Sequence, residues 1–305
     1  MNLLLEQILE ECSCYALQGK VADYIPELSK ANAENFGIAV FSEDGKLFYS
    51  GDYKEKFTMQ SIVKPFILLL ALLDKGEERV RELVGVEATG KPFDAFNYSD
   101  QALNSEHINP MINTGAIALC TLIAGDSYAE KFARLLELVG KMTGNSSIQI
   151  NEKVYLSEKA TGYKNRALAY MLKAYGMLDG GVEEVVEFYF RACSIEVDCR
   201  DLARAAFTLA NRGKDPITGE QIFKAEYASY INAVLTTSGM YDGSGEFALT
   251  VGLPAKSGVG GGIMAVAPRR MGIGIYSPAL DKKGNSVAGK KALELLSKRL
   301  HLSIF

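Results

Sequence analysis

The sequence predicts a mixed α/β (α+β) fold with a mostly antiparallel sheet, and two observations support this prediction. The β-rich runs of the 305-residue chain lie near its two ends, while most of the chain between them has the apolar spacing of helices, several of which end at glycine. Strands that are grouped apart from helices favour antiparallel pairing over βαβ units. We therefore expect a discontinuous α/β sheet domain, residues 1–60 plus 241–305, with a mainly helical domain, residues 61–240, inserted into it.

The elements of the sheet domain can be predicted in chain order. Residues 2–18 carry an apolar stripe at helical spacing, and residues 37–52 form two β-rich runs joined by an Asp-Gly pair, which is typical of a hairpin. Residues 247–280 are rich in Val, Ile and Gly, which indicates strands with a turn near Pro268. Residues 286–300 have the pattern of a helix. N- and C-terminal helices would therefore flank the sheet.

Composition and charge argue against several classes of function. Apolar residues make up 48% and charged residues 23% of the chain, and the net charge is −4, so we expect no nucleic-acid partner. The apolar stretches are shorter than the roughly 20 residues that cross a bilayer, and acidic residues interrupt the N-terminal one, unlike in a secretory signal. We therefore expect a cytoplasmic protein without membrane association. In that compartment its five cysteines would be reduced thiols, namely Cys12, Cys14, Cys120, Cys193 and Cys199.

The residue types that usually bind metals are scarce. Only two histidines occur, His107 and His301, and the Cys12-x-Cys14 pair has no second pair at zinc-finger spacing. The chain has no Walker A motif. The glycines of residues 258–262 lack dinucleotide-binding spacing, and we expect them in a strand packed tightly against a ligand. The sequence therefore predicts no metal and no cofactor, and it favours a nucleophile that needs neither histidine nor metal.

One S-x-x-K tetrad, Ser61-Ile62-Val63-Lys64, supplies such a nucleophile. It opens a strongly apolar predicted helix, on which Ser61 and Lys64 would share a face. Ser61 would lie at the helix N-terminus, where free N–H groups favour developing negative charge. A lysine that acts as a base must be largely uncharged. Burial among apolar neighbours favours the uncharged form, because an ordinary lysine has a pKa of about 10.4.

A second lysine strengthens this interpretation. Lys256-Ser257-Gly258 opens a predicted strand, and S-x-x-K on a helix followed much later by K-[ST]-G on a strand is the pairing of penicillin-recognising serine acylases. About one S-x-x-K match is expected by chance in a chain of this size. If the match is a chance occurrence, Ser61 would cap a helix and Lys64 would be a surface lysine. The two motifs in this order favour an acylation site.

Six longer stretches resemble the glutaminase family of serine hydrolases. They occur in the family's order and at closely similar intervals over about residues 20–280, with one local departure at Thr114, where the family's string has alanine. The resemblance implies a β-lactamase/transpeptidase-like fold, no cofactor, a homo-oligomer (dimer or tetramer) and hydrolysis of L-glutamine to L-glutamate and ammonia. We expect the active site at the junction of the two predicted domains. The stretches are FTMQSIVKP, NPMINTGAI, SEKATGYKNRALAY, FYFRACSIEVDC, SGMYDGSGEFA and VGLPAKSGVGGGI.

The resemblance also implies roles for individual residues. Ser61 would be the nucleophile, Lys64 the general base and Tyr241 the proton relay. Such a set suits free glutamine, because a carboxylate can pair with its α-ammonium while amides and phenols can donate to its α-carboxylate. Backbone N–H groups of Ser61 and Val259 would bind the oxyanion. The substrate-binding residues implied are Tyr24, Ser61, Asn113, Glu158, Asn165, Tyr189, Tyr241 and Val259, the last through its backbone.

Other functions stay open at this stage. A β-lactamase or penicillin-binding-like acylase of the same fold should carry an S-D-N or Y-x-N motif, which is not apparent, and its cell-wall substrates lie outside the cytoplasm. A non-catalytic amino-acid-binding protein on this fold should have lost Ser61, Lys64 or Tyr241, and all three are present. Asparagine is one methylene shorter than glutamine, which a pocket discriminates by only about 1 to 3 kcal/mol. Modest activity on asparagine therefore stays open as well.

Overall fold

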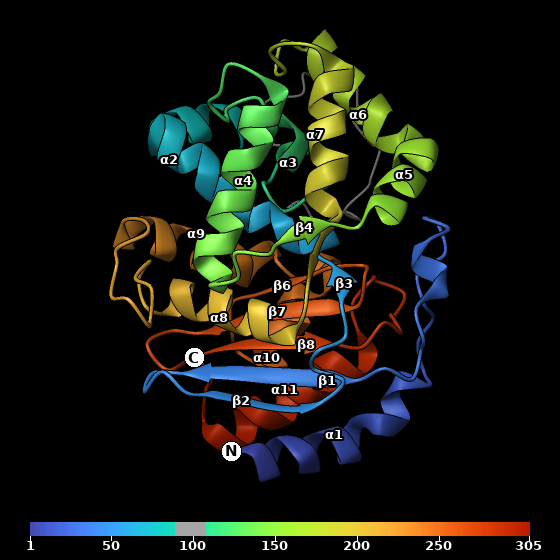
Figure 1. Cartoon of the computed structure of the whole chain (residues 1–305), viewed down its shortest axis with the longest axis vertical. Coiled ribbons are helices and arrows are strands. Elements are labelled where there is room, and N and C mark those ends of the chain that lie inside the picture. The colour runs from blue at the N-terminus through green and yellow to red at the C-terminus, as the bar shows by residue number, and fades with distance from the viewer. Residues whose placement is uncertain (89–107) are drawn as a thin grey trace.

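The computed structural model describes residues 1–88 and 108–305, and its central element is a five-stranded antiparallel sheet (Figure 1). The strand order is β2-β1-β8-β7-β6, so the N-terminal hairpin pairs with the C-terminal strands through β1 and β8. The predicted α+β architecture with an antiparallel sheet is confirmed. The strands are β1 (Gly37–Ser42), β2 (Leu47–Gly51), β6 (Ala255–Ser257), β7 (Gly262–Ala267) and β8 (Met271–Tyr276).

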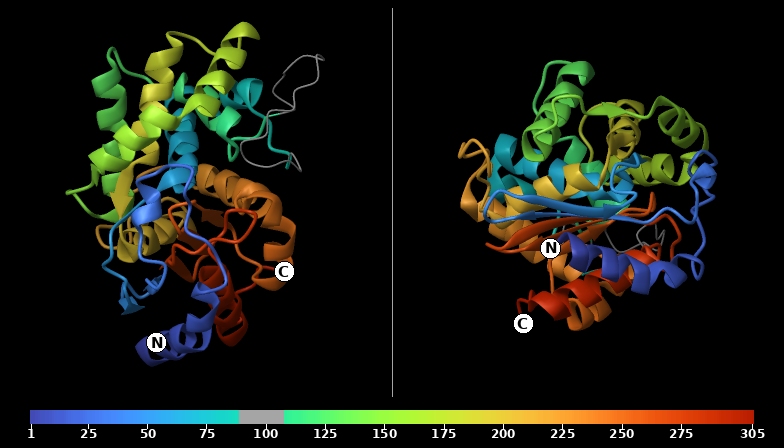
Figure 2. Two further views of the ribbon diagram at one scale, coloured as in Figure 1. Left: turned by 90° about the vertical axis from the view of Figure 1, so that its right-hand side faces the viewer. Right: turned by 60° about the horizontal axis from the view of Figure 1, so that its bottom comes forward.

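Three helices cover one face of this sheet, and they are α1 (Asn2–Ala16), α10 (Ser244–Thr250) and α11 (Val287–Leu300). The right-hand view of Figure 2 shows α1 and α11 side by side below the sheet. Alternate strand residues, such as Ile273 and Ile275 of β8, pack into this cluster because successive side chains of a strand point to opposite faces. The predicted N- and C-terminal helices are confirmed.

Helix α8 (Cys199–Ala210) lies against the opposite face, and two glycines of β8 allow it to approach closely. A Cβ atom at Gly272 would lie 2.1 Å from the Ala203 carbonyl oxygen, and one at Gly274 would lie 2.1 Å from that of Cys199. No side chain larger than hydrogen fits at these distances without backbone movement. The glycines in the MGIGIY strand therefore serve helix packing.

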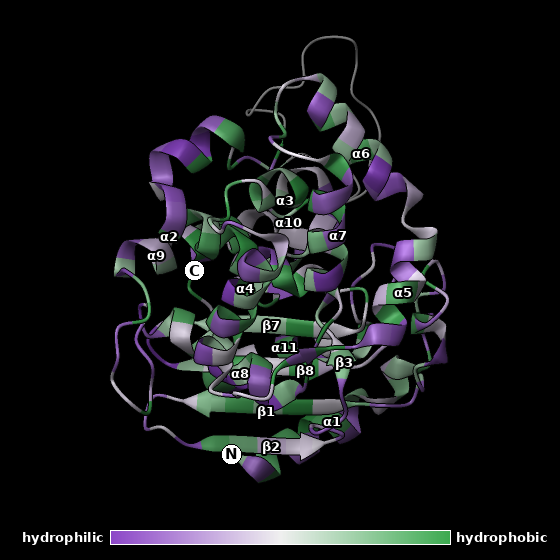
Figure 3. Ribbon diagram, turned by 45° about the horizontal axis from the view of Figure 1, so that its top comes forward, coloured by the Kyte–Doolittle hydropathy of each residue, from purple (hydrophilic) through white to green (hydrophobic). Residues whose placement is uncertain are grey.

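The remaining helices form a second layer above α8, around a continuous apolar core (Figures 1 and 2). Helix α2 is apolar around its whole circumference between Phe66 and Leu72, because other helices surround it. In Figure 3 the strands of the sheet are mainly hydrophobic, while hydrophilic residues lie on the outer turns of α2 and α6. These helices are α2 (Lys64–Leu83), α3 (Asn113–Cys120), α4 (Tyr128–Thr143), α5 (Glu152–Thr161), α6 (Tyr163–Ala174), α7 (Val182–Cys193) and α9 (Ala225–Ser238).

The division into domains 1–60 plus 241–305 and 61–240 stays a prediction. Helix α8 belongs to the second range by sequence but packs on β1, β7 and β8 of the sheet. It also contacts α4 on its other side, where the Thr208 hydroxyl donates to the Met142 carbonyl oxygen at 3.2 Å. Because α8 touches both layers, it joins the sheet to the helices.

Two features differ from the elements expected. A small second sheet, in the order β3-β5-β4, was not predicted, because strands of two or three residues are too short to show alternation. Its strands are β3 (Phe57–Thr58), β4 (Gln149–Ile150) and β5 (Ile195–Val197). The prediction that β structure resumes near Phe247 was wrong, because Phe247 lies in α10. Phe247 and Val251, one helical turn apart, both pack into the core beneath the sheet.

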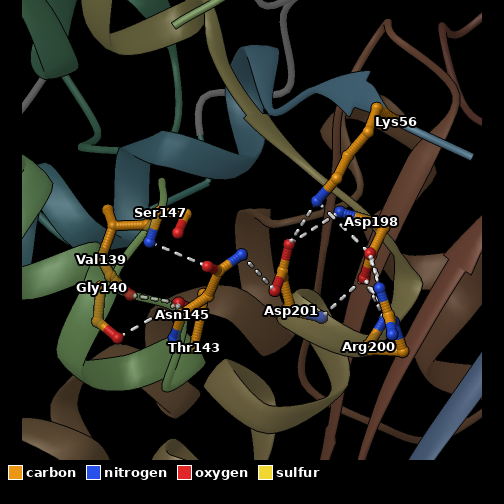
Figure 4. Close-up of polar contacts among 9 residues, drawn as sticks. All are labelled: Lys56, Val139, Gly140, Thr143, Asn145, Ser147, Asp198, Arg200 and Asp201. Carbon is orange, nitrogen blue, oxygen red and sulfur yellow. Dashed lines mark hydrogen bonds and ion pairs between the residues drawn. The ribbon is translucent and has the colours of Figure 1, made fainter. Parts of the chain in front are cut away.

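A cluster of charges joins the second sheet to both layers (Figure 4). The fully buried Asp198 caps the N-terminus of α8, and Lys56 contacts Asp198 at 3.3 Å and Asp201 at 3.1 Å. Asn145, just after α4, donates to Asp201 at 3.1 Å. Burial alone would raise the pKa of Asp198, but the hydrogen bond from Arg200 and the charge of Lys56 hold it below its usual value. The segment that leads to β3 is thereby fixed.

The remaining sequence expectations concern single residues and the membrane. All five cysteines are free thiols, and His301 is exposed after the end of α11, whereas His107 lies outside the described residues. Within residues 1–88 and 108–305, no helix combines the length and the apolarity needed to cross a bilayer.

The contact between α8 and β8 predicts a position-specific loss of stability. Gly274→Ala should lower the free energy of unfolding by about 3 kcal/mol or more, because the added methyl group would overlap the Cys199 carbonyl. Gly245→Ala is the matched control, since Gly245 is exposed on α10 and its Cβ would meet no atom within 4 Å. Denaturant unfolding measures both. Equal stability of the two variants would contradict the close packing described.

Candidate active site

Ser61 lies on a 3₁₀ turn, Gln60–Val63, between β3 and α2. The Met59 N–H donates to the Ile195 carbonyl oxygen at 2.8 Å, which extends the pairing of β3 with β5 to the residue before Gln60. The chain then turns sharply, with Gln60 at a φ of +48°, and α2 begins with Lys64 and Pro65 in its first turn. Proline fits there because the N–H it lacks would have no partner within the helix. Ser61 thereby lies at the entrance of a long buried helix.

Lys64 is fully buried in the first turn of α2, and its amine faces α3. Its Nζ donates to the Asn113 Oδ1 at 2.7 Å and to the Met111 carbonyl oxygen at 3.1 Å. Helices α2 and α3 pack directly against each other, which brings these residues together although they are 49 positions apart in sequence. The alternative that Lys64 is a surface lysine is therefore wrong.

Lys256 is the second buried amine of this region, and it lies in β6 as the KSG motif predicted. Its Nζ donates to the carbonyl oxygens of Gly239 at 2.9 Å and Ser257 at 2.7 Å, and it lies 4.2 Å from the centre of the Tyr241 ring. Burial, followed by the nearby charge of Lys64, lowers the pKa of Lys256 well below its usual value. Two buried amines so close together disfavour a charge on both.

Tyr241 opens a short 3₁₀ turn, Tyr241–Gly243, at a φ of +55°. Its hydroxyl donates to the Ser257 carbonyl oxygen at 3.0 Å. Burial raises the pKa of Tyr241 well above its usual range, and a hydrogen bond with Ser61 opposes that shift in part. The phenol therefore stays protonated at neutral pH and lies within reach of the Ser61 hydroxyl.

A cavity of about 440 Å³ opens above Ser61, and six of the predicted site residues line it. Tyr24 is the most exposed of them and lies at its edge, whereas Glu158 and Tyr189 are almost fully buried. The volume suits a small metabolite. The six are Tyr24, Ser61, Asn113, Glu158, Asn165 and Tyr189.

The predicted polar residues of the cavity form a connected network. Asn113 begins α3 and uses its Oδ1 to accept hydrogen bonds from Lys64 and, at 3.2 Å, from the Tyr189 hydroxyl. Its Nδ2 donates to the Asn165 Oδ1 at 2.9 Å. Asn165 lies in the first turn of α6, and Tyr189 lies on α7. Three helices thus orient these side chains, which leaves the Asn165 amide hydrogens to face a ligand.

Glu158, on α5, is 4% exposed and has no hydrogen-bond partner for its Oε2 among the described residues. Burial raises its pKa from 4.5 to about 8, while the charge of Lys64 and a hydrogen bond from Gln60 act in the opposite direction. A buried carboxyl oxygen without a hydrogen-bond partner lowers the free energy of unfolding. A cationic group entering the cavity would supply the missing partner.

Val259 lies between the end of β6 and β7, and its side chain packs into a separate small cluster with Ile25 and Leu28. Its loop touches the Ser61 segment, since a Cβ at Gly258 would lie 2.4 Å from the Met59 carbonyl oxygen and one at Gly260 would lie 2.7 Å from that of Thr58. The glycines expected to pack against a ligand therefore pack against the segment that leads to Ser61. This contact brings the Val259 backbone close to the serine.

Several residues of the cavity were not predicted. Gln60 and Cys193 are buried and line it, and Thr161, Gly162, Tyr163 and Lys164 border it. The sequence signals were present but weak: Gln60 directly precedes Ser61, and Cys193 lies one helical turn after Tyr189 on α7.

A family model described as Glutaminase matches residues 19–305 of the chain. The chain belongs to the glutaminase family. It is 50% identical to Glutaminase 2 of Clostridium perfringens and 51% identical to the glutaminase of Clostridium tetani, in each case over 100% of both chains. As a member of this family it is an amidohydrolase with the β-lactamase-like fold.

One of the similar solved structures is a covalent complex. The chain is similar, with a TM-score of 0.91 and 38% identity over 100% of this chain and 99% of the other, to the Bacillus subtilis glutaminase in covalent complex with 5-oxo-L-norleucine. That complex formed by reaction of the Bacillus protein with 6-diazo-5-oxo-L-norleucine. The Bacillus protein therefore forms a covalent bond with this reagent.

The raised pKa of Glu158 predicts a pH-dependent KM for glutamine. In the free protein the carboxyl is protonated below about pH 8. If its carboxylate form pairs with the substrate ammonium, KM should fall as the pH rises from 6 to 8. Glu158→Gln should raise KM and remove this dependence. Glu152→Gln, exposed on the same helix, should keep both the KM and its pH profile. Steady-state assays of ammonia release give the KM of all three proteins. A wild-type KM that does not depend on pH would contradict the pairing of Glu158 with the substrate ammonium.

Proposed function

We propose that the site hydrolyses L-glutamine to L-glutamate and ammonia through an ester on Ser61, with Lys64 as general base. The observation that carries the proposal is the position of Ser61. It lines a cavity together with the buried Glu158 carboxyl, one oxygen of which lacks a partner among the described residues, and it lies one helical turn from a fully buried amine. A hydroxyl becomes a nucleophile when a neighbouring base accepts its proton.

Glutamine would bind through its amino-acid end. The α-ammonium pairs with Glu158, whose Oε2 lacks a partner among residues 1–88 and 108–305, and the carboxyl itself is almost fully buried. The α-carboxylate accepts hydrogen bonds from the amide of Asn165 and the hydroxyl of Tyr24. The Tyr189 hydroxyl, whose one hydrogen goes to the Asn113 Oδ1, borders this subsite, and the Asn113 amide holds Asn165 in place. The side-chain amide then extends towards Ser61.

In the acylation step, the Ser61 Oγ attacks the amide carbonyl carbon while its proton passes to Lys64. The oxyanion that forms accepts hydrogen bonds from the backbone N–H groups of Ser61 and Val259, and one such donor contributes about 3 to 4 kcal/mol. The loop of Val259 packs against the serine segment, which supports this pairing of donors. The lowered pKa of Lys256 favours its neutral form, so Lys256 does not oppose the positive charge that Lys64 gains when it accepts the Ser61 proton.

Tyr241 would carry the proton to the leaving group. Its raised pKa keeps the phenol protonated, so it can donate to the departing amine and then regain a proton from Lys64, which holds the proton taken from Ser61. Water then attacks the glutamyl ester, and the same groups return the proton to Ser61. Ammonia and glutamate are released.

A comparison of three substrates distinguishes the functions that the sequence left open. We expect ammonia from glutamine, slower release from asparagine and no opening of a chromogenic cephalosporin. A binding protein on this fold would release ammonia from neither amino acid. Cytoplasmic location and self-association as a dimer or tetramer stay predictions.

Removal of the nucleophile gives the direct test of the proposed role of Ser61. Ser61→Ala should lower kcat for glutamine by about a thousandfold or more, because alanine has no hydroxyl with which to form the ester. Thermal unfolding should change little, since the serine hydroxyl is a small part of a well-packed turn. Ammonia release at wild-type rate by a folded Ser61→Ala protein would refute the assignment.

Removal of the base has a matched control on the same helix. Lys64→Met keeps the length and apolar bulk of the side chain but cannot accept a proton, so kcat should fall by about 100-fold or more. Lys75→Met, at an exposed position of α2, should keep wild-type activity. A loss below tenfold in Lys64→Met would argue against the Ser61–Lys64 pair.

A further inference from the structure

We propose that Lys256 is a positioning residue for Tyr241, which keeps the Ser257 carbonyl hydrogen-bonded while the Tyr241 hydroxyl turns to protonate the leaving group. This role rests on the proposed function and deepens it. It explains how a phenol whose hydrogen is engaged in the resting protein can still serve as a proton donor. The lysine would thereby act on departure of the leaving group and not on binding of the substrate.

The Ser257 carbonyl oxygen accepts hydrogen bonds from two side chains. The Tyr241 hydroxyl donates to it at 3.0 Å, and the Lys256 Nζ donates to it at 2.7 Å. A backbone carbonyl has two lone pairs, which these two donors fill. Ser257 and Lys256 are both 0% exposed, so the contact lies away from bulk water. A donor that leaves this carbonyl is therefore not replaced by solvent.

The same amine also holds the turn on which Tyr241 lies. The Lys256 Nζ donates to the Gly239 carbonyl oxygen at 2.9 Å, and that oxygen also accepts from the Ser257 N–H at 3.2 Å. The Nζ lies 4.2 Å from the centre of the Tyr241 ring. Gly239 is packed tightly on β6, because a Cβ there would lie 1.7 Å from the Ala255 carbonyl oxygen. Lys256 therefore contacts the ring, the turn before it and the carbonyl that its hydroxyl binds.

The backbone on both sides of the Tyr241 ring is fixed by side chains. The Met240 N–H donates to the Ser244 Oγ at 3.1 Å, and this hydroxyl donates to the Tyr241 carbonyl oxygen at 2.9 Å. The Asn285 Nδ2 donates to the Met240 carbonyl oxygen at 3.1 Å. A phenol has one hydrogen, so Tyr241 must give up its bond to Ser257 before it can protonate an amine. Rotation about the C–O bond of the phenol redirects that hydrogen while the backbone stays in place.

Lys256 lowers the cost of this redirection. When the C–N bond breaks, its electron pair stays on nitrogen and the Tyr241 proton goes to that nitrogen. Lys64 then returns to the phenol the proton that it took from Ser61. During the transfer the Ser257 carbonyl keeps its hydrogen bond from Lys256. Without the amine, the same rotation would leave a buried carbonyl unpaired, and an unpaired buried polar group is costly.

Two leaving groups separate this role from a general loss of structure. Glutamine releases an amine, which must gain a proton, whereas the γ-(para-nitrophenyl) ester of L-glutamate releases a nitrophenolate, which needs none. Lys256→Met keeps the apolar bulk of the side chain but leaves the Tyr241 hydroxyl as the donor to Ser257, so the phenol is held there. In this variant kcat/KM for glutamine should fall about tenfold or more, and kcat/KM for the ester should change by less than about threefold.

Two further variants calibrate the test. Tyr241→Phe removes the proton donor and should show the same pattern, with a loss on glutamine and little change on the ester. Lys298→Met, at an exposed position of α11, should keep wild-type values with both substrates. If Lys256→Met does not fold, Lys256→Leu also removes the amine and is measured in the same way.

The outcomes distinguish this role from the proposed function. An equal fractional loss with both substrates in a folded Lys256 variant, or an unchanged kcat/KM for glutamine, overturns the inference. Wild-type hydrolysis of glutamine by Tyr241→Phe would refute the proton relay, and the role of Lys256 with it. Failure of the wild-type protein to release ammonia from glutamine would instead refute the proposed function itself.

Discussion

The rest of the site depends on how the segment from Phe57 to Ser61 is held between the two layers. On one side β3 pairs with β5, and the Met59 N–H continues that pairing to the residue before the turn. On the other side the loop after β6 lies so close that Gly258 and Gly260 have no room for a side chain. Since both contacts are made by backbone, the position of Ser61 is fixed by the fold itself.

The site keeps its polar groups at an energetic cost that the substrate relieves. Lys64 and Lys256 are both fully buried amines, and Glu158 is a buried carboxyl with one oxygen that has no partner in the described part of the chain. Such groups destabilise the folded chain unless they are neutral or paired. A zwitterionic substrate brings an ammonium for Glu158 and a carboxylate for the amides and phenols. The free energy of unfolding of the protein with an empty site is therefore lower than the size of its core alone would allow. Substrate binding restores part of this stability.

The fold was predictable wherever the sequence signal is local. The hairpin of β1 and β2, the two terminal helices and the S-x-x-K spacing at the start of α2 follow from periodicity and turn residues alone. Contacts between residues far apart in sequence could not be predicted from these local signals. Asn113 contacts Lys64, and Glu158 lines the same cavity as Ser61, only because helices pack together. The resemblance to a family was needed to name these residues. Phe247 was misplaced in a strand because a short apolar run fits either helix or strand. Gln60 was missed because its place directly before Ser61 is a weak signal and backbone strain leaves no mark in the composition.

The central claim is that Ser61 attacks a glutamine-like carbonyl with the help of Lys64. Labelling with 6-diazo-5-oxo-L-norleucine, followed by peptide mapping with mass spectrometry, identifies the attacking side chain. The rate of labelling measures the contribution of Lys64. The account predicts a single adduct on Ser61 in the wild-type protein and a labelling rate about 100-fold lower in Lys64→Met. An adduct on another side chain, or labelling of Ser61 at the same rate without the lysine, would contradict it.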